Sequence, residues 1–327
     1  MIRHDVVEKL FDVIDEMSMI LVSNLSWNYL DAICGACQNL VENDILQDVN
    51  TDSEVQLFNL CKQVGELEFS REEVRKALQL ALLKGLKSKN ASLDMMTPDS
   101  IAIVIGYLSG KLISDMSDIS IGDFSVGTGN LLTAFLNNIE VTSQNLYGVD
   151  DNYEMLKLAK MMADMQEYEV QFYHQSSASP MAVPQFELLI GDLPVGEIDP
   201  IGLDLEIANV GCKYLPYLLV ENHLRYLAPG GYGIYVIPND FFSQKFAADF
   251  HSVIVKSAHI QMLLQLPESM FKDAGQTKSL FVIQKQGLDV RPVDEVLAVA
   301  MPDFSEIEKF REMLTNIDNW IKLNKAN

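Results

Sequence analysis

Between about residues 118 and 285 the chain alternates short apolar segments with amphipathic ones, which limits its fold more than any other feature. The apolar segments predict strands at 119–124, 145–150, 168–174, 186–191, 232–238, 260–267 and 279–285. Helical patterns between them predict helices at 131–138, from 151, at 213–227 and at 244–256. This alternation predicts an α/β fold with a mostly parallel sheet and helices on both faces. The last two strands follow each other without a helix, so the last is expected to run antiparallel.

Residues 1–90 show only helical periods and predict an all-helical N-terminal domain. Val7, Leu10 and Ile14 share one face of the first helix. A polar stretch at 87–100 marks the boundary, where Thr97 and Pro98 suit a helix start. We therefore predict a helical domain at 1–90, an α/β domain at 91–290, and a strand and helix at 291–327 packed on it. Pro229, Gly230 and Gly231 predict a turn between a helix and a strand.

The charge balance argues against strong nucleic-acid binding by this chain alone. Its 327 residues carry a net charge of −22, and residues 91–290 hold 24 acids against 10 bases. Phosphate recognition relies on Lys and Arg, so duplex binding is expected to be weak. The sequence has no apolar run long enough for a membrane helix, and its acidic amino terminus does not resemble a signal peptide. The four cysteines are too scattered to predict a disulfide framework. A cytoplasmic protein is the expectation.

A glycine turn follows the first predicted strand in the segment DFSVGTGN, residues 123–130. Gly127 and Gly129 allow a ligand to approach the backbone, and the next strand ends in Asp150, 21 residues after Gly129. An acid at that place commonly binds a ribose. A dinucleotide fingerprint would need a third glycine where Leu132 stands. The set indicates an adenosine-containing ligand, and an ordinary α/β turn with a solvated Asp is the alternative.

The segment FELLIGDLPVG, residues 186–196, predicts a buried strand that ends in a stiff turn. Asp192 is at the tip, followed by Leu193 and Pro194. Its carboxylate is either a catalytic group or the polar cap of a strand.

Six segments in order resemble the class I S-adenosylmethionine-dependent methyltransferases: MTPDSIA, DFSVGTGNLL, YGVD, GDLPVG, the stretch from YLPYLLVENHL to IPNDFF, and LPESMF with TKSLFVIQK. Within that class the chain resembles the N6-adenine DNA methyltransferases, especially the modification subunits of type I restriction systems. A bacterial branch often encoded near competence genes is most similar. The resemblance covers about residues 90–290 and, loosely, the helical part.

The resemblance implies that S-adenosyl-L-methionine is the cofactor. Thr97 would contact its methionine end, Asp150 would bind the ribose, and Ser176 would replace the Asp that often contacts the adenine. The backbone from the first strand into the following helix would surround the methionine end, through Asp123, Phe124, Ser125, Gly127, Thr128, Gly129 and Asn130.

The resemblance also implies a role for the turn that begins at Asp192. In the family this turn has the sequence Asn or Asp, then two prolines, then an aromatic residue. A conjugated amine is a poor nucleophile, and two acceptors can localise its lone pair. The Asp192 carboxylate and the Leu193 carbonyl would be these acceptors, with Pro194 keeping the turn rigid. Val195 stands where an aromatic residue would stack on a flipped base, and Glu197 and Asp199 would repel phosphate.

Other candidates are open to two interpretations. Phe241 and Phe242 either supply the missing stacking or pack in the core, and His174 either lines the pocket or is structural. Cys34 and Cys37 form a C-x-x-C without a second ligand pair, so packing is expected rather than a metal site.

Two functions are consistent with these features. The first is a methyltransferase acting on an amino nitrogen, most like N6-adenine methylation, with RNA or a protein side chain as other acceptors. A specificity subunit or another protein partner would explain the missing recognition domain, and a homodimer is possible. The second is a catalytically inactive methyltransferase-like protein that serves as a cofactor-binding or interaction module.

Overall fold

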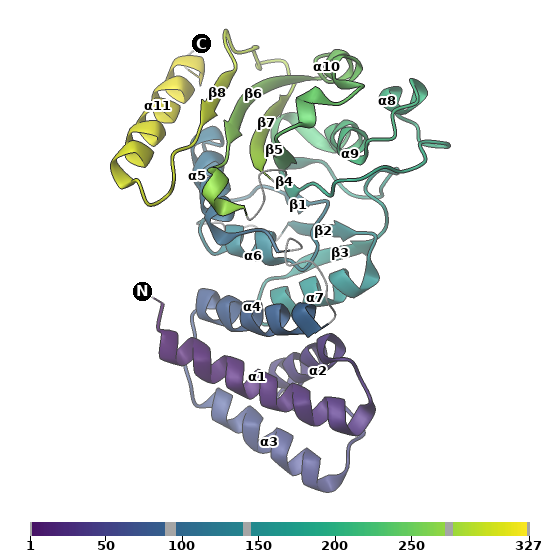
Figure 1. Cartoon of the computed structure of the whole chain (residues 1–327), viewed down its shortest axis with the longest axis vertical. Coiled ribbons are helices and arrows are strands. Elements are labelled where there is room, and N and C mark those ends of the chain that lie inside the picture. Colours follow the sequence, from purple (N-terminus) through teal and green to yellow (C-terminus); the bar gives the residue numbers. More distant parts are fainter. Residues whose placement is uncertain (1, 89–95, 140–144, 272–276, 326–327) are drawn as a thin grey trace. The chain divides into compact units, whose positions relative to one another are not determined.

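The computed structural model describes residues 2–88, 96–139, 145–271 and 277–325 (Figure 1). The chain divides into two compact units. The first comprises Met1–Ile103, Val126–Ile139 and Asn152–Phe172, and the second comprises Val104–Ser125, Glu140–Asp151 and Tyr173–Asn327. Part of the predicted boundary segment, residues 89–95, lies outside the described residues.

The first unit is helical, as the amino-terminal sequence predicts. Its helices are α1 (His4–Leu25), α2 (Tyr29–Glu42), α3 (Thr51–Gly65), α4 (Arg71–Ser88), the start of α5 (Asp99–Leu112), α6 (Asn130–Leu136) and α7 (Tyr153–Asp164). Asn28 and Asn50 cap α2 and α3, because their side chains accept bonds from the amides of Asp31 and Ser53.

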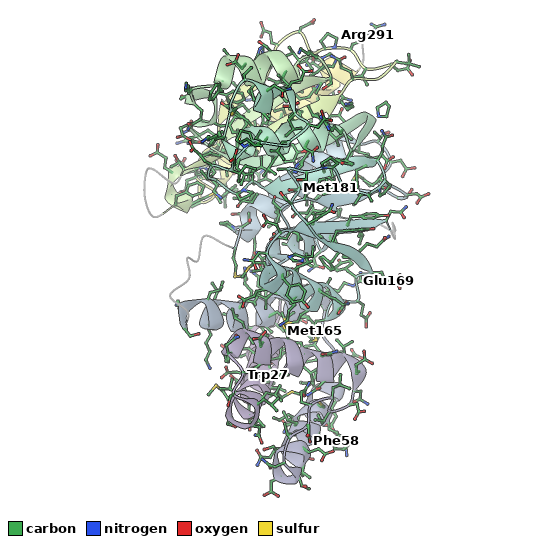
Figure 2. The ribbon with its side chains drawn as sticks, turned by 90° about the vertical axis from the view of Figure 1, so that its right-hand side faces the viewer. Trp27, Phe58, Met165, Glu169, Met181 and Arg291 are labelled. Carbon is green, nitrogen blue, oxygen red and sulfur yellow. The ribbon has the colours of Figure 1, made fainter. Side chains whose placement is uncertain are left out.

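The apolar faces of these helices form the core of the first unit. Leu10, Ile14 and Met17 of α1 are almost completely buried. Cys37 belongs to the same core, and burial raises the pKa of its thiol. Among the described residues no group of three His, Cys, Asp or Glu side chains could hold a metal ion. Phe58 on α3 is 44% exposed, with the Lys62 ammonium 4.5 Å from its ring centre (Figure 2).

The strands form an eight-stranded sheet in the order β3-β2-β1-β4-β5-β7-β6-β8, and all of them except the first three residues of β3 belong to the second unit. The strands are β1 (Ile121–Asp123), β2 (Leu146–Asp150), β3 (Val170–His174), β4 (Phe186–Asp192), β5 (Leu227–Pro238), β6 (Ala258–Gln265), β7 (Lys278–Lys285) and β8 (Leu297–Ala300). β1, β2, β4 and β5 pair in parallel, and β6 is parallel to β8. β7 is antiparallel to both β5 and β6, as the sequence predicts.

The start of β5 differs from the prediction. We expected a turn at Pro229–Gly231, whereas these residues lie inside the strand, which begins at Leu227. The pairing of β4 with β5 shifts register between Phe186 and Leu188, and Gly230 has φ 84°. The Pro-Gly-Gly sequence is therefore a bulge.

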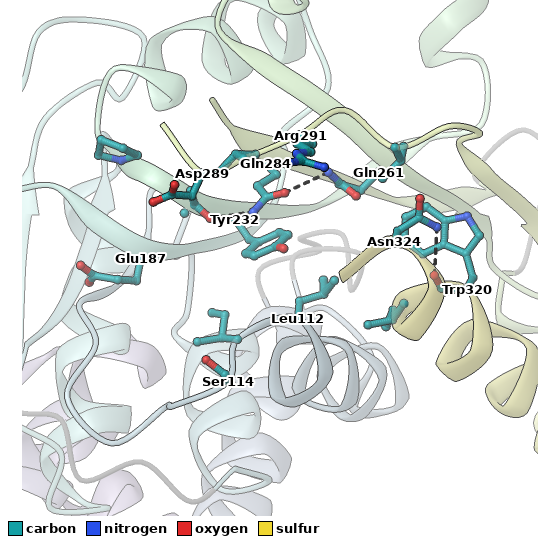
Figure 3. A pocket seen from close by; sticks show the side chains of 17 residues that line it. Leu112, Ser114, Glu187, Tyr232, Gln261, Gln284, Asp289, Arg291, Trp320 and Asn324 are labelled. Carbon is teal, nitrogen blue, oxygen red and sulfur yellow. Dashed lines mark hydrogen bonds between the residues drawn. The ribbon is translucent and has the colours of Figure 1, made fainter. Parts of the chain in front are cut away.

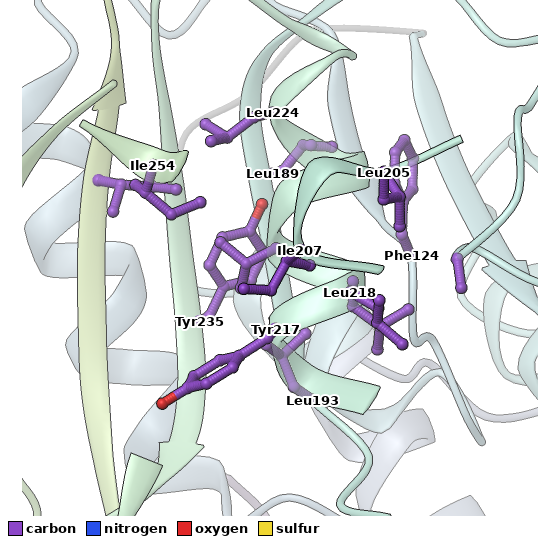
Figure 4. Packing of buried hydrophobic residues seen from close by; sticks show 14 of the residues in the cluster. Phe124, Leu189, Leu193, Leu205, Ile207, Tyr217, Leu218, Leu224, Tyr235 and Ile254 are labelled. Atoms are coloured by element: carbon purple, nitrogen blue, oxygen red, sulfur yellow. The ribbon is translucent and has the colours of Figure 1, made fainter. Parts of the chain in front are cut away.

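Helices and short 3₁₀ turns complete the second unit. They are α8 (Glu206–Asn209), α9 (Leu215–Leu224), α10 (Ala247–Ile254), α11 (Ile307–Lys325) and the turns Phe241–Ser243 and Glu268–Met270. α9 ends three residues earlier than predicted. Tyr217 and Leu218 of α9 are completely buried in the cluster shown in Figure 4. α11 contacts α5, where the Tyr107 hydroxyl donates to Oδ1 of Asp318 at 2.7 Å. None of the described helices is long and apolar enough to cross a membrane.

Candidate active site

Three neighbouring parallel strands of the second unit each end in an aspartate. Asp123 ends β1, Asp150 ends β2 and Asp192 ends β4. Asp123 is in register with Gly148 and Ile190, so all three acids lie at the carboxyl edge of the sheet. In open α/β sheets ligands bind beyond this edge.

Asp123 is completely buried. Its Oδ1 accepts a bond from the Ser125 amide at 3.0 Å, whereas Oδ2 has no hydrogen-bond partner in the described part of the chain. Burial raises the pKa of Asp123 to about 8; the Ser125 amide acts in the opposite direction, and the charges of Asp150 and Asp192 add to the rise. A cation beside Oδ2 would favour the ionised form.

Ser125 and Gly191 define the space next to this carboxyl group. The Ser125 hydroxyl is buried and also has no partner among the described residues. A Cβ on Gly191 would lie 2.8 Å from the Ser125 Oγ and 3.3 Å from Oδ1 of Asp123. Any larger residue at 191 would therefore push against both groups. Phe124, between Asp123 and Ser125 in the sequence, has a different role. Its ring is buried and lies edge-on to Phe186 at 5.2 Å, so only its backbone is available to a ligand.

The glycine turn belongs to the first unit. Gly127 and Gly129 have φ values of 52° and 77°, a region that favours glycine. A Cβ on Gly129 would also lie 3.0 Å from the Cα of Ala159 in α7. Packing of α6 on α7 therefore requires glycine there whether or not a ligand binds. Thr128 is buried.

The first unit also brings Thr97 and Asn130 together. Nδ2 of Asn130 donates to the Thr97 carbonyl at 2.8 Å. Oδ1 of Asn130 accepts from the Arg75 guanidinium of α4, also at 2.8 Å. Sequence reasoning missed Arg75, because nothing in the regular helical pattern of 71–88 distinguishes it from a surface arginine.

The turn after β3 holds the residue predicted to contact adenine. The Ser176 hydroxyl accepts from the Ala178 amide at 3.4 Å and is half-buried. The backbone N–H of Gln175 donates to the Asp150 carbonyl at 3.1 Å, so the residue before Ser176 lies against the end of β2. His174 is exposed, and its Nε2 lies 3.0 Å from the Asp151 carbonyl.

Asp192 forms an ion pair with Lys278. The ammonium donates to Oδ1 of Asp192 at 2.7 Å, with side-chain exposures of 23% for Lys278 and 14% for Asp192. Lys278 begins β7, which is antiparallel and therefore starts at the edge where the parallel strands end. Sequence reasoning missed this lysine. The antiparallel strand and the charged residue at its start were the available signal.

The residues after Asp192 differ in exposure. The Leu193 amide donates to the Val236 carbonyl at 3.1 Å, and the Leu193 side chain is buried in the cluster of Figure 4. Pro194 is exposed, and Val195 is 62% exposed.

Of the two interpretations of Phe241, the structure favours core packing over stacking on a base. Its side chain is completely buried and lies edge-on to Tyr217 at 4.8 Å, within the core. Phe242 is half-buried and lies edge-on to Phe281 at 5.4 Å.

A cavity of about 470 Å³ lies elsewhere in the second unit (Figure 3). Tyr232, Gln261, Gln284 and Trp320 contribute to its wall. Gln261 donates to Gln284 at 3.0 Å inside it. None of the predicted site residues lines this cavity.

Two family models match the chain. The model described as the YtxK N-terminal helical domain matches residues 8–86, and the N-6 DNA methylase model matches residues 82–319. A curated relative, the uncharacterized protein YtxK of Bacillus subtilis, is 31% identical over 328 residues, covering 99% of this chain and 100% of the relative.

Solved structures agree with this assignment. A protein of Listeria monocytogenes, described as a candidate class I S-adenosylmethionine-dependent methyltransferase, is 31% identical with a TM-score of 0.85, over 98% of this chain and 100% of that one. The methyltransferase subunit of a type I restriction-modification system from Streptococcus thermophilus is 12% identical with a TM-score of 0.60, over 97% of this chain and 75% of that one, and shows the fold alone. With its methyltransferase fold and a family model that matches most of its length, the chain belongs to the N-6 DNA methylase family.

Proposed function

We propose that this protein is an S-adenosylmethionine-dependent methyltransferase that acts on an amino nitrogen, most like the N6 of adenine in nucleic acid. The observation that carries the proposal is the carboxyl edge of the sheet. There a buried Asp123 has an unpartnered oxygen within the described structure, and Asp150 and Asp192 end the neighbouring strands.

The buried groups at this edge fit the methionine end of the cofactor, which carries an ammonium group. Oδ2 of Asp123 and the hydroxyl of Ser125 are polar atoms that need partners, and Gly191 adds no side chain beside them. An ammonium would supply donors and would offset the raised pKa of Asp123.

The other predicted contacts complete the proposed cofactor site. The backbone of Phe124, Gly127, Thr128 and Gly129 would surround the methionine end together with Thr97 and Asn130. Asp150 would accept from the ribose hydroxyls, and Ser176 would contact the adenine. S-adenosylmethionine, when bound, supplies an electrophilic methyl group on its sulfonium.

Asp192 and Leu193 would hold the acceptor amine. The Asp192 carboxylate and the Leu193 carbonyl accept its N–H bonds, which localises the nitrogen lone pair. Pro194 limits the conformations of the turn. The Asp192–Leu193–Pro194–Val195 sequence is thus a degenerate form of the family motif, because Val195 offers no aromatic face.

A partner would supply recognition of the acceptor. The net charge of −22 opposes tight nucleic-acid binding by this chain alone. We therefore propose that a specificity subunit, another protein or a second copy of the chain joins it in the cytoplasm. The helical domain at 1–90 is the proposed docking part, beside a methyltransferase domain at 91–290 and an extension at 291–327.

The first test is calorimetric titration with S-adenosylmethionine. We expect a Kd at or below about 100 μM, which is roughly −5.5 kcal/mol, and its loss in Asp150→Ala. Asp151→Ala, which changes the exposed next residue, is the matched control and should bind normally. A wild-type protein that binds no cofactor would contradict the proposal.

A second candidate is the inactive interaction module. The Asp192–Lys278 ion pair favours it, because the lysine already takes one of the carboxylate oxygens proposed to bind the acceptor. Transfer of labelled methyl groups to DNA, RNA and protein fractions distinguishes the two. Labelling that disappears in Asp192→Ala, which removes the side-chain acceptor, supports the enzyme, whereas cofactor binding without labelling of any fraction supports the module.

A further inference from the structure

The Arg75 side chain is completely buried in the first unit. Its Nε and Nη2 donate to the two carboxylate oxygens of Glu72, at 2.8 and 2.5 Å. Nη1 donates at 2.8 Å both to Oδ1 of Asp99 and to Oδ1 of Asn130. The guanidinium therefore joins α4 to the first turn of α5 and to the first residue of α6.

These bonds fix the orientation of the Asn130 amide. Its oxygen accepts from a permanently charged guanidinium, so its nitrogen must point the other way. That nitrogen donates to the Thr97 carbonyl at 2.8 Å. Arg75 thus reaches Thr97 through one intervening side chain, and a flipped amide would present an oxygen to the Thr97 carbonyl oxygen.

The C-terminal end of α6 is also bonded to α4. Asn137, which follows the last residue of α6, donates from Nδ2 to Oε2 of Glu72 at 3.0 Å and to Oε1 of Gln166 at 2.9 Å. The Tyr168 hydroxyl donates to Oδ1 of Asn137 at 2.8 Å. Glu72 and Arg75, one turn apart on α4, therefore fix both ends of α6.

The charges in this network are compensated. Burial acts to raise the pKa of Asp99, but the hydrogen bonds and charges of Arg75 and Lys76 outweigh it and lower the pKa to about 2. Gln79 adds a donor to the same carboxylate at 3.1 Å. A buried ionic network is seldom the most stabilising way to fill a core, and apolar residues of similar volume often serve stability as well. The polar network instead specifies one geometry for the groups that it joins.

We propose that Arg75 is a positioning residue for cofactor binding: through Asn130 it holds Thr97 and the start of α6 in the conformation that receives the methionine end. This inference rests on the proposed function. It gives the helical amino-terminal part a task in cofactor binding besides any role in docking a partner.

The test compares three variants of the full chain. Arg75→Met removes the guanidinium and keeps an apolar stem. Asn130→Asp keeps the oxygen that accepts from Arg75 but cannot donate to the Thr97 carbonyl. It therefore tests the Asn130–Thr97 hydrogen bond while leaving the ion pairs of Arg75 in place. Arg3→Met is the control, because Arg3, which is 52% exposed, also pairs with a glutamate of α4, Glu73 (2.8 Å), but does not reach Thr97 or Asn130.

Two readouts are used. Calorimetry gives the Kd for S-adenosylmethionine, which we expect to rise at least tenfold in Arg75→Met and Asn130→Asp and to change less than twofold in Arg3→Met. Amide hydrogen exchange of the ligand-free protein should become faster at residues 96–103 and 129–133 in the first two variants only.

Three outcomes would overturn the inference: normal affinity in Asn130→Asp, an equal loss in Arg3→Met, or unchanged exchange at both segments in Arg75→Met. If Arg75→Met does not fold, Asn130→Asp decides alone. If the wild type binds no cofactor, the proposed function fails, and the exchange experiment still decides whether Arg75 holds these segments.

Discussion

The Lys278 ammonium lies 2.7 Å from Oδ1 of Asp192, although the two residues are 86 positions apart in the chain. An acceptor amine proposed to bind Asp192 would compete with this lysine for the same oxygen. The pair is mostly buried, so its removal has consequences for stability as well as for function.

We expect Asp192→Asn and Lys278→Met each to lower the free energy of unfolding, because each leaves a partly buried charge unpaired or a polar group unsatisfied. A double-mutant cycle measured by urea unfolding should give a coupling energy of about 1 kcal/mol. The exposed pair Lys309–Glu306 is the control and should show no measurable coupling. Additive effects for Asp192 and Lys278 would show that the ion pair does not form in solution.

Asp123 should make the ligand-free protein less stable as pH rises. Its pKa is about 8 in the folded chain against an ordinary value of 3.8, so between these values the folded state holds a proton that the unfolded state has lost. The free energy of unfolding should therefore fall from pH 4 to pH 8, by up to about 1.4 kcal/mol per pH unit. Asp123→Asn should reduce this slope, and Asp204→Asn, at an exposed site, should not. Urea unfolding at pH 5, 6, 7 and 8 measures it; equal slopes in all three proteins would contradict the expectation.

His223 should act at the acidic end. Burial lowers its pKa to about 3 from 6.5, and neither ring nitrogen has a partner within the described residues. Below pH 6.5 His223 is protonated in the unfolded chain but remains neutral in the folded chain. The free energy of unfolding therefore falls as the pH drops toward 3. The stability of His223→Leu should change less than that of the wild type between pH 6.5 and 4. The stability of His251→Leu, which changes an exposed position, should vary with pH as the wild type does. Thermal unfolding across that interval provides the comparison.

Gly191→Ala should weaken cofactor binding at least tenfold. The new Cβ would lie 2.8 Å from the Ser125 Oγ, so Ser125 or the strand must move, with a stability cost of about 1–3 kcal/mol. Gly196→Ala is the matched control, since a Cβ there would meet no atom within 4 Å. Calorimetry with S-adenosylmethionine checks the affinity, and an alanine variant at 191 that binds like the control would count against the proposed site.

The fold was largely predictable because its signals are local. Strand-length apolar segments, helical periods and a missing helix before residue 279 were enough to predict the mostly parallel sheet, the antiparallel last strand and the strand that ends in Asp150. The bulge at Pro229–Gly231 was not predictable, since the same three residues also favour an ordinary turn and only the register with β4 decides.

The candidate site was predictable only in part. Backbone positions such as Gly127 and Gly129 follow from turn chemistry. Arg75 does not, because its partner Asn130 lies 55 residues away and no local pattern reports such a distance. The pairing of Lys278 with Asp192, 86 residues away, could be inferred only by placing the start of the antiparallel strand at the edge where the parallel strands end. The cofactor and substrate roles of the site residues remain predictions.

The position of β7 also affects how the protein can be made. β7 lies between β5 and β6, yet β6 is synthesised before it. While the chain emerges from a ribosome, β6 has no neighbour through which to join the sheet, and β5 keeps an open edge until residue 285 is available. Non-local strand pairing of this kind folds slowly and leaves exposed strands open to mispairing. Nascent chains that stop before β7 are therefore expected to need protection from aggregation, and full-length chains are not.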